Sequence, residues 1–327
     1  MNIKEQTNNF KNMINSYKLT YLIISSNKIG IFDCLQENSK NLNQIAKELK
    51  IESNRIEPIL NSLVCNKIID KDKNGYFVSE YKDILCKESG NNQLGYINFA
   101  ETMIKKYQYL EKAIIDKDFA TNNFKELTEE NAESFMKGME ANAIQQANFI
   151  VNNYNFENHN VLDVGAGAGT YLITVAKKYE TVTGKMIDLP QMVKIQNKRI
   201  EKEQLKARII FEECNYNVDF PKEKYDDVFL FAVAHQESEE NLNKLLSNIY
   251  DVLKPDGRLF LTSFFLNEDK ISPDFSVQFA VEMLMNSNNG KVYTYNEIEN
   301  LMSENKFKKI QRVDNIPSPA TLYIAKK

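Results

Sequence analysis

The chain has 327 residues, of which 43% are hydrophobic and 26% are charged, so it can bury a sizeable core and is long enough to suggest two domains. Its formal net charge is −4 at pH 7, and like charges form no long block, which argues against nucleic acid or an anionic membrane as the main partner. The longest apolar run, Val228 to Ala234, is far shorter than the roughly 20 residues of a membrane-spanning helix, and the amino terminus resembles no targeting signal, so we expect a cytoplasmic protein.

The first part of the chain has the pattern of a winged helix. Short amphipathic helices are predicted between residues 12 and 66, and Asn41 and Ser53 stand where two of them should be capped. Two short apolar segments follow, Ile68–Asp70 and Tyr76–Val78, and the Asn-Gly pair between them is a strong turn signal. Helices followed by a hairpin predict a winged-helix domain over residues 1–95.

A winged helix raises the possibility of DNA binding, which the charges argue against. Residues 1–95 contain 13 Lys and Arg against 11 Asp and Glu, and the helix that would enter a major groove, residues 54–66, carries one Arg and one Glu. Specific DNA-binding proteins commonly neutralise about 6–10 phosphates. We therefore expect this domain to pack or dimerise, with no nucleic-acid partner.

Residues 96–150 are predicted to be helical and to join the two domains. Phe99, Met103 and Tyr107 recur on one side, and Phe135 and Met139 begin a second stripe. Such stripes usually pack into a core, and the alternative is that they wall an apolar pocket.

From residue 151 to 327 strands alternate with helices. The predicted strands are Asn160–Val164, Val182–Ile187, Ala207–Phe211, Asp227–Ala234 and Arg258–Phe265. Alternation of this kind predicts an α/β fold with a mostly parallel, doubly wound sheet, covered by helices on both faces. Ligands of such sheets bind at the carboxyl ends of the strands.

A glycine-rich loop follows the first of these strands. Asp163 is followed by Gly165, Gly167 and Gly169 at alternate positions, and a helix is predicted directly afterwards. Glycines let a ligand approach the backbone, and a helix N-terminus offers free N–H groups. A dinucleotide-binding fingerprint would need Gly or Ala where Thr170 stands.

This loop resembles the first motif of class I methyltransferases that use S-adenosylmethionine (SAM), in which it wraps the methionine end of the cofactor. Asp188 stands at the end of the second predicted strand. A carboxylate there can accept hydrogen bonds from both ribose hydroxyls, and the alternative is a helix cap.

The resemblance extends to a family. Asp188-Leu189-Pro190, Tyr225 to Leu230, His235 and Leu253 to Arg258 occur in the order seen in small-molecule O-methyltransferases of plant and bacterial secondary metabolism. Members of that family have an N-terminal winged-helix dimerisation domain and a Rossmann-like class I methyltransferase domain. The resemblance therefore implies a homodimer that binds SAM and a small-molecule acceptor.

The resemblance also implies roles for particular residues. The implied cofactor-binding residues are Asp163, Gly165, Gly167, Gly169, Asp188, Leu189, Asn215 and Tyr216. Asn215 and Tyr216 would hold the adenine by hydrogen bonding and stacking, although they could equally belong to an ordinary loop. The implied substrate-binding residues are Met139, Phe279, Met283 and Asn286.

His235 matches the catalytic base of the family, which removes the acceptor's hydroxyl proton. In plant members two Glu residues flank this His, and Ser263 and Val292 stand in their places, while Gln236 follows the His where Asp is common. Without carboxylate partners the basicity and tautomer of a His are less well fixed. The acceptor would then be an acidic oxygen, or a nitrogen or activated carbon that needs little help from a base.

The favoured function is methyl transfer from SAM, by in-line displacement, to a hydroxyl oxygen of an apolar or aromatic small molecule. One alternative is a SAM-binding homologue that performs other small-molecule chemistry, and a weaker one is a SAM-sensing winged-helix regulator. The four cysteines are scattered and only two histidines are present, so we expect neither a disulfide framework nor a bound metal.

Overall fold

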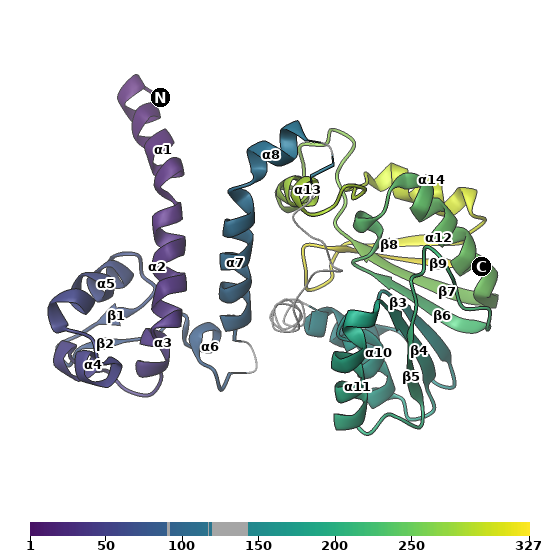
Figure 1. Ribbon diagram of the computed structural model, residues 1–327, viewed down its shortest axis with the longest axis horizontal. Helices are drawn as coiled ribbons and strands as arrows, with labels where there is room; N and C mark the ends of the chain where they lie inside the picture. Colours follow the sequence, from purple (N-terminus) through teal and green to yellow (C-terminus); the bar gives the residue numbers. More distant parts are fainter. Residues whose placement is uncertain (90–91, 117, 120–142) are drawn as a thin grey trace. The chain divides into compact units, whose positions relative to one another are not determined.

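The structure of the chain is a computed structural model that describes residues 1–89, 92–116, 118–119 and 143–327. The chain forms two compact units, Met1–Lys105 and Lys106–Lys327, whose elements are drawn in Figure 1. None of the helices in the described ranges is both long and apolar enough to cross a membrane.

The first unit consists of helices and one small hairpin. Its elements are α1 (Ile3–Asn15), α2 (Tyr17–Lys28), α3 (Ile31–Cys34), α4 (Leu42–Leu49), α5 (Ser53–Cys65), β1 (Asp70–Lys71), β2 (Tyr76–Phe77), α6 (Lys82–Leu85) and most of α7 (Leu94–Tyr107). Asn41 caps α4 as predicted, accepting from the Gln44 N–H at 3.0 Å. The cap predicted at Ser53 is wrong by one residue, because Glu52 is the N-cap of α5 and Ser53 is its first helical residue.

The second unit is an α/β layer structure around a seven-stranded sheet of order β5-β4-β3-β6-β7-β9-β8. Its strands are β3 (Asn160–Val164), β4 (Thr183–Asp188), β5 (Ile209–Glu213), β6 (Tyr225–Phe231), β7 (Leu253–Ser263), β8 (Lys308–Val313) and β9 (Thr321–Lys326). The strands from β5 to β7 pair in parallel, whereas β9 is antiparallel to both β7 and β8. The mostly parallel sheet is therefore confirmed. Strands β9 and β8 extend it, and β9 is the strand that runs against the others.

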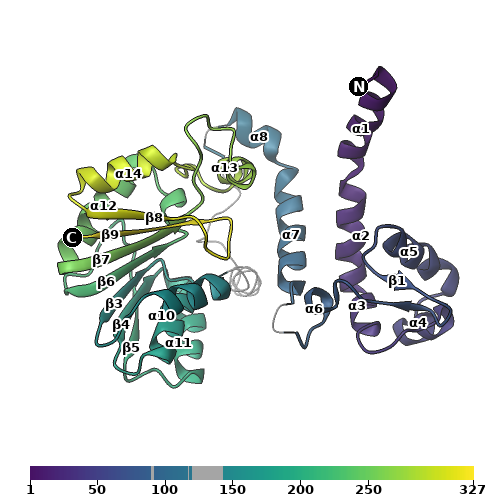
Figure 2. The ribbon, with the colours of Figure 1, turned by 180° about the vertical axis from the view of Figure 1, so that it is seen from behind.

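Helices cover both faces of this sheet, as predicted. The named helices of the second unit are α8 (Leu110–Ile115), α10 (Thr170–Lys178), α11 (Val193–Lys202), α12 (Glu239–Val252), α13 (Asp274–Asn286) and α14 (Tyr295–Glu304). Leu162 and Val164 of β3 face the core under α12 and α14, whereas Val161 faces the core under α10 and α11. The two helix pairs are seen on opposite sides of the sheet in Figures 1 and 2. This alternation along β3 follows the two-residue period of a strand.

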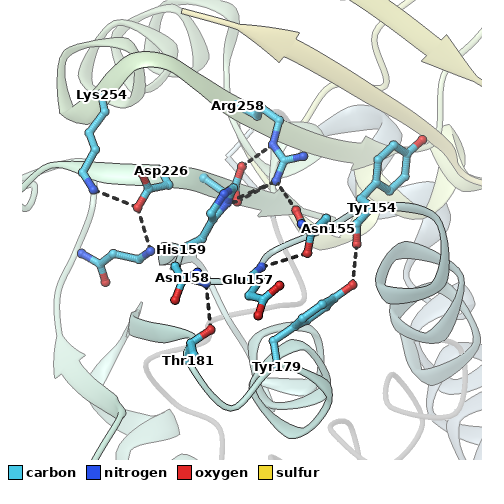
Figure 3. A network of polar contacts seen from close by, with 12 residues as sticks. Tyr154, Asn155, Glu157, Asn158, His159, Tyr179, Thr181, Asp226, Lys254 and Arg258 are labelled. Atoms are coloured by element: carbon cyan, nitrogen blue, oxygen red, sulfur yellow. Dashed lines mark hydrogen bonds and ion pairs between the residues drawn. The ribbon is translucent and has the colours of Figure 1, made fainter.

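A buried ionic network lies at the amino-terminal edge of the sheet, shown in Figure 3. The Asp227 carboxylate has no exposed surface and binds His159 Nδ1 at 2.6 Å and Arg258 Nε at 2.6 Å. The neighbouring Asp226 carboxylate accepts from the Asn160 N–H and from Lys254 Nζ, both at 2.8 Å. Because the ligand sites of parallel sheets lie at the other, carboxyl-terminal edge, we assign this network to stability.

Candidate active site

The glycine-rich loop forms a bare bend between the end of β3 and the start of α10. Gly165, Gly167 and Gly169 have φ angles of 64°, 54° and 71°, in the left-handed region that favours glycine. A Cβ on Gly165 would lie 2.7 Å from Val233 Cγ2, and one on Gly169 would lie 2.4 Å from Met186 Sδ. The bend therefore needs glycine for its conformation at all three positions, and for space at Gly165 and Gly169.

Asp188 ends β4, the strand beside β3, and its side chain reaches the bend. The carboxylate accepts from the Gly167 N–H and from the Leu189 N–H, each at 2.7 Å. Burial raises the pKa of Asp188, and the two N–H donors oppose this by lowering it. These contacts put the carboxylate beside the glycine bend, and its ribose-binding role remains a prediction.

Three buried oxygen atoms in the segments that form or follow the bend and Asp188 have no hydrogen-bond partner in the described part of the chain. They are Asp163 Oδ2, Gln191 Oε1 and Gln196 Oε1. Asp163 is only 1% exposed, and burial raises its pKa to about 8, with the Asp188 carboxylate adding to the rise. Buried acceptors without donors are costly, so this region is suited to a ligand that carries several N–H or O–H groups.

Helix α11 holds the bend through side chains that the sequence analysis missed. Gln196 is fully buried and its Nε2 donates to the Gly167 carbonyl. Arg199 Nη1 donates to the Ala168 carbonyl at 2.9 Å and to Thr170 Oγ1 at 3.0 Å. The only signal in the sequence is that Gln196 and Arg199 are three residues apart and so share one face of the helix.

The segment after β5 brings Tyr216 to the bend. Tyr216 Cε1 lies 3.8 Å from the position that a Cβ would take on Gly165, and its hydroxyl donates to Glu237 Oε1 at 2.8 Å. Asn215 is exposed, and its Oδ1 accepts from the Asn217 N–H at 3.1 Å within its own turn. The adenine-binding roles of Asn215 and Tyr216 remain predictions.

His235 lies in a short 3₁₀ helix (Ala234–Gln236) after β6, with its side chain buried. Its Nδ1 lies 2.9 Å from Ser263 Oγ, and its ring packs against Phe279 at 4.7 Å and Phe264 at 6.0 Å between centroids. Burial lowers the pKa of His235 to about 3. Its imidazole is therefore neutral at physiological pH and has a hydroxyl partner in place of a carboxylate.

The predicted substrate residues of α13 share one face of that helix. Phe279, Met283 and Asn286 are spaced by four and three residues, and Met283 and Asn286 are buried. Asn286 Oδ1 accepts from Lys106 Nζ at 3.0 Å. Met139 lies outside the described residues.

Comparisons with known proteins agree with this geometry. The model of a family described as an O-methyltransferase domain matches residues 107–308. The chain is 24% identical over 319 residues to the S-adenosyl-L-methionine-dependent methyl transferase PigF of Serratia sp. (strain ATCC 39006), with 93% of this chain and 91% of that protein covered.

Two solved structures are similar over nearly the whole chain. PigF with SAH has a TM-score of 0.86 at 19% identity, with 100% of both chains covered. Human N-acetylserotonin methyltransferase in complex with SAM has a TM-score of 0.85 at 19% identity, with 100% of this chain and 98% of that chain covered. Together with the family match over more than half of the sequence, these findings mean that the chain belongs to the O-methyltransferase family and is a SAM-dependent methyltransferase.

Proposed function

We propose that the protein transfers the methyl group of SAM to an acidic hydroxyl of a small aromatic molecule. The observation that carries this proposal is the aromatic wall beside His235. The ring of Phe264 lies 4.6 Å from that of Phe279 and 4.7 Å from that of Phe275, and Phe279 packs edge-on against the His235 imidazole. Aromatic rings prefer such offset and edge-to-face neighbours, so this wall suits a flat aromatic acceptor with its hydroxyl near His235.

The residues around the glycine bend fit SAM, which carries an ammonium group, two ribose hydroxyls and an adenine amine. In our proposal the bend holds the methionine end, Asp163 Oδ2 accepts from the ammonium group and Asp188 accepts from the ribose. The unpaired oxygens of Asp163, Gln191 and Gln196 support this fit, because each needs a donor. Leu189 would contact the adenosine, while Tyr216 and Asn215 would hold the adenine. When bound, SAM supplies an electrophilic methyl group, whose transfer to the acceptor oxygen breaks a carbon–sulfur bond and leaves its electron pair on sulfur.

His235 is suited to orienting an ionised acceptor oxygen. Proton transfer from a phenol with a pKa near 10 to an imidazole whose pKa is lowered to about 3 would be strongly unfavourable. The acceptor hydroxyl is therefore expected to lose its proton to solvent before it attacks. If Ser263 donates to Nδ1, Nε2 carries the hydrogen and can donate to the acceptor oxygen. This assignment favours phenols acidified by their ring substituents.

The proposal is tested by incubating the protein with methyl-labelled SAM and a panel of aromatic hydroxyl compounds of graded acidity. The expected result is a labelled methyl ether and one equivalent of the demethylated cofactor for the more acidic members. His235→Ala serves as the matched variant and should bind SAM normally but turn over more slowly. Tight SAM binding without any labelled product would instead favour other small-molecule chemistry, and tight binding of random duplex DNA at low salt would favour a regulator.

For the assembly, we propose a cytoplasmic homodimer formed through a winged-helix domain over residues 1–95, followed by pocket helices over 96–150 and the methyltransferase domain over 151–327. Helix α1 has no buried residue. Its large apolar side chains, together with that of the residue that opens α2, are more than half exposed: Ile3, Phe10, Met13, Ile14 and Tyr17. An uncovered apolar stripe of this kind supports a partner helix from a second copy. Phe10→Asp should shift the molecular mass in solution from dimer to monomer.

A further inference from the structure

Glu237 is a buried carboxylate that has only neutral partners in the described part of the chain. It is 5% exposed, and its Oε1 accepts from the Tyr216 hydroxyl at 2.8 Å and from Asn217 Nδ2 at 3.0 Å. Lys244 also reaches this loop, but its ammonium group donates to the Asn217 carbonyl at 3.3 Å. A buried carboxylate without a cation is costly to maintain, which points to a use for its charge.

The side chain of Tyr216 connects this carboxylate to the glycine bend. Its ring lies beside Gly165, next to Val233, and its hydroxyl holds the Glu237 carboxylate in place. The pKa of Tyr216 is raised well above its ordinary value, first by burial and then by the nearby charges of Glu237 and Asp188. The bend is therefore close to carboxylates in two directions, one at the end of β4 and one beyond the tyrosine.

We propose that Glu237 is a specificity residue that selects the sulfonium cofactor over its neutral demethylated product. The inference rests on the proposed placement of the cofactor over the bend. Methyl transfer removes one positive charge from sulfur, so a fixed negative charge nearby attracts the cofactor more strongly than the product. Charge interactions in a partly buried site reach over several ångströms, so Glu237 can act through Tyr216 without touching the ligand. The same charge difference would let fresh cofactor compete better with product for the site.

The test compares two ligands in one variant. Glu237→Gln keeps the shape of the side chain and an oxygen acceptor for Tyr216 and Asn217, but it removes the charge. By calorimetry we expect SAM to bind this variant about 5–20-fold more weakly, while the affinity for S-adenosylhomocysteine changes by less than about twofold. Sinefungin, which carries a cationic amine near the position of the sulfonium, should follow SAM.

Two further variants complete the experiment. Glu237→Asp keeps the charge and should retain the wild-type preference for SAM. If Glu237→Gln folds poorly, this variant still tests whether the preference follows the charge. Glu239→Gln is the matched surface control, because that carboxylate pairs with Lys291 and is exposed, and it should leave both affinities unchanged.

Equal weakening of both ligands in Glu237→Gln would overturn the proposal, because the carboxylate would then only hold Tyr216 in place. Unchanged affinities for both ligands would overturn it as well. Wild-type protein that binds neither ligand would instead remove the proposed cofactor site itself, so the two failures can be told apart.

Discussion

Replacing Asp163 by Asn should make the free protein more stable at alkaline pH. The carboxyl is 1% exposed and its pKa is raised from 3.8 to about 8, chiefly by burial. Because the folded-state pKa is the higher one, the stability contributed by the protonated carboxyl is complete below pH 3.8 and is lost as the pH rises towards 8. A shift of this size corresponds to roughly 6 kcal/mol. Relaxation of the buried site should leave an effect of about 2–4 kcal/mol between pH 5 and 8.

Urea unfolding of the wild type and of Asp163→Asn at several pH values between 5 and 8 tests this expectation. Asn keeps an oxygen that can accept from the Leu172 N–H, so any other cost of the substitution should be independent of pH. The free energy of unfolding of the variant should exceed that of the wild type by an amount that grows with pH. The contributions of other titrating groups are the same in both proteins and cancel in this difference. Saturating SAM should reverse the order, since its ammonium group would favour the ionised carboxylate. Parallel stability curves for the two proteins would refute the reasoning.

Four further predictions concern the bend, the acceptor site and the ionic network. Asp188→Asn should weaken SAM binding by about 1–3 kcal/mol, and an unchanged affinity in calorimetry would remove the ribose assignment. Gln196→Leu leaves the Gly167 carbonyl without its donor and should weaken SAM binding about tenfold. Full affinity would show that the hydrogen bond from α11 to the bend is dispensable. The pH profile of kcat/KM should rise with the ionisation of each acceptor, and a fixed rise near pH 6.5 for every acceptor would mean that His235 works as a base. Asp227→Asn should destabilise folding by about 3–5 kcal/mol in chemical denaturation while leaving kcat unchanged, and a loss of kcat in folded protein would contradict a purely structural role.

Much of the sheet could be predicted because its inner strands are short apolar runs. The bounds of β3 agree with the prediction, and β4 begins one residue later than predicted. Strands β8 and β9 were missed. In β8 the alternating pattern is obscured, because Lys308, Lys309, Gln311 and Arg312 are exposed on an edge strand, where charged residues protect against pairing with another chain.

The site was predictable as far as it depends on the backbone. Glycines at positive φ and an acid at a strand end leave a local signature, so the bend and Asp188 could be located from spacing alone. Side chains that are distant in sequence and are brought together only by the tertiary fold leave no such signature. Gln196 reaches the bend from a helix after the next strand, and Glu237 reaches Tyr216 from beyond β6. The burial of His235 follows from α13 packing over it, which no local pattern encodes.

Strand β9 has a consequence for how the protein is made. It comes after every other strand in the chain, yet it lies between β7 and β8. During synthesis one edge of the long strand β7 therefore stays without a hydrogen-bonding partner until β9 has left the ribosome. An unpaired strand edge is prone to aggregation, so a premature stop before residue 321 should yield aggregates rather than a shortened but soluble enzyme.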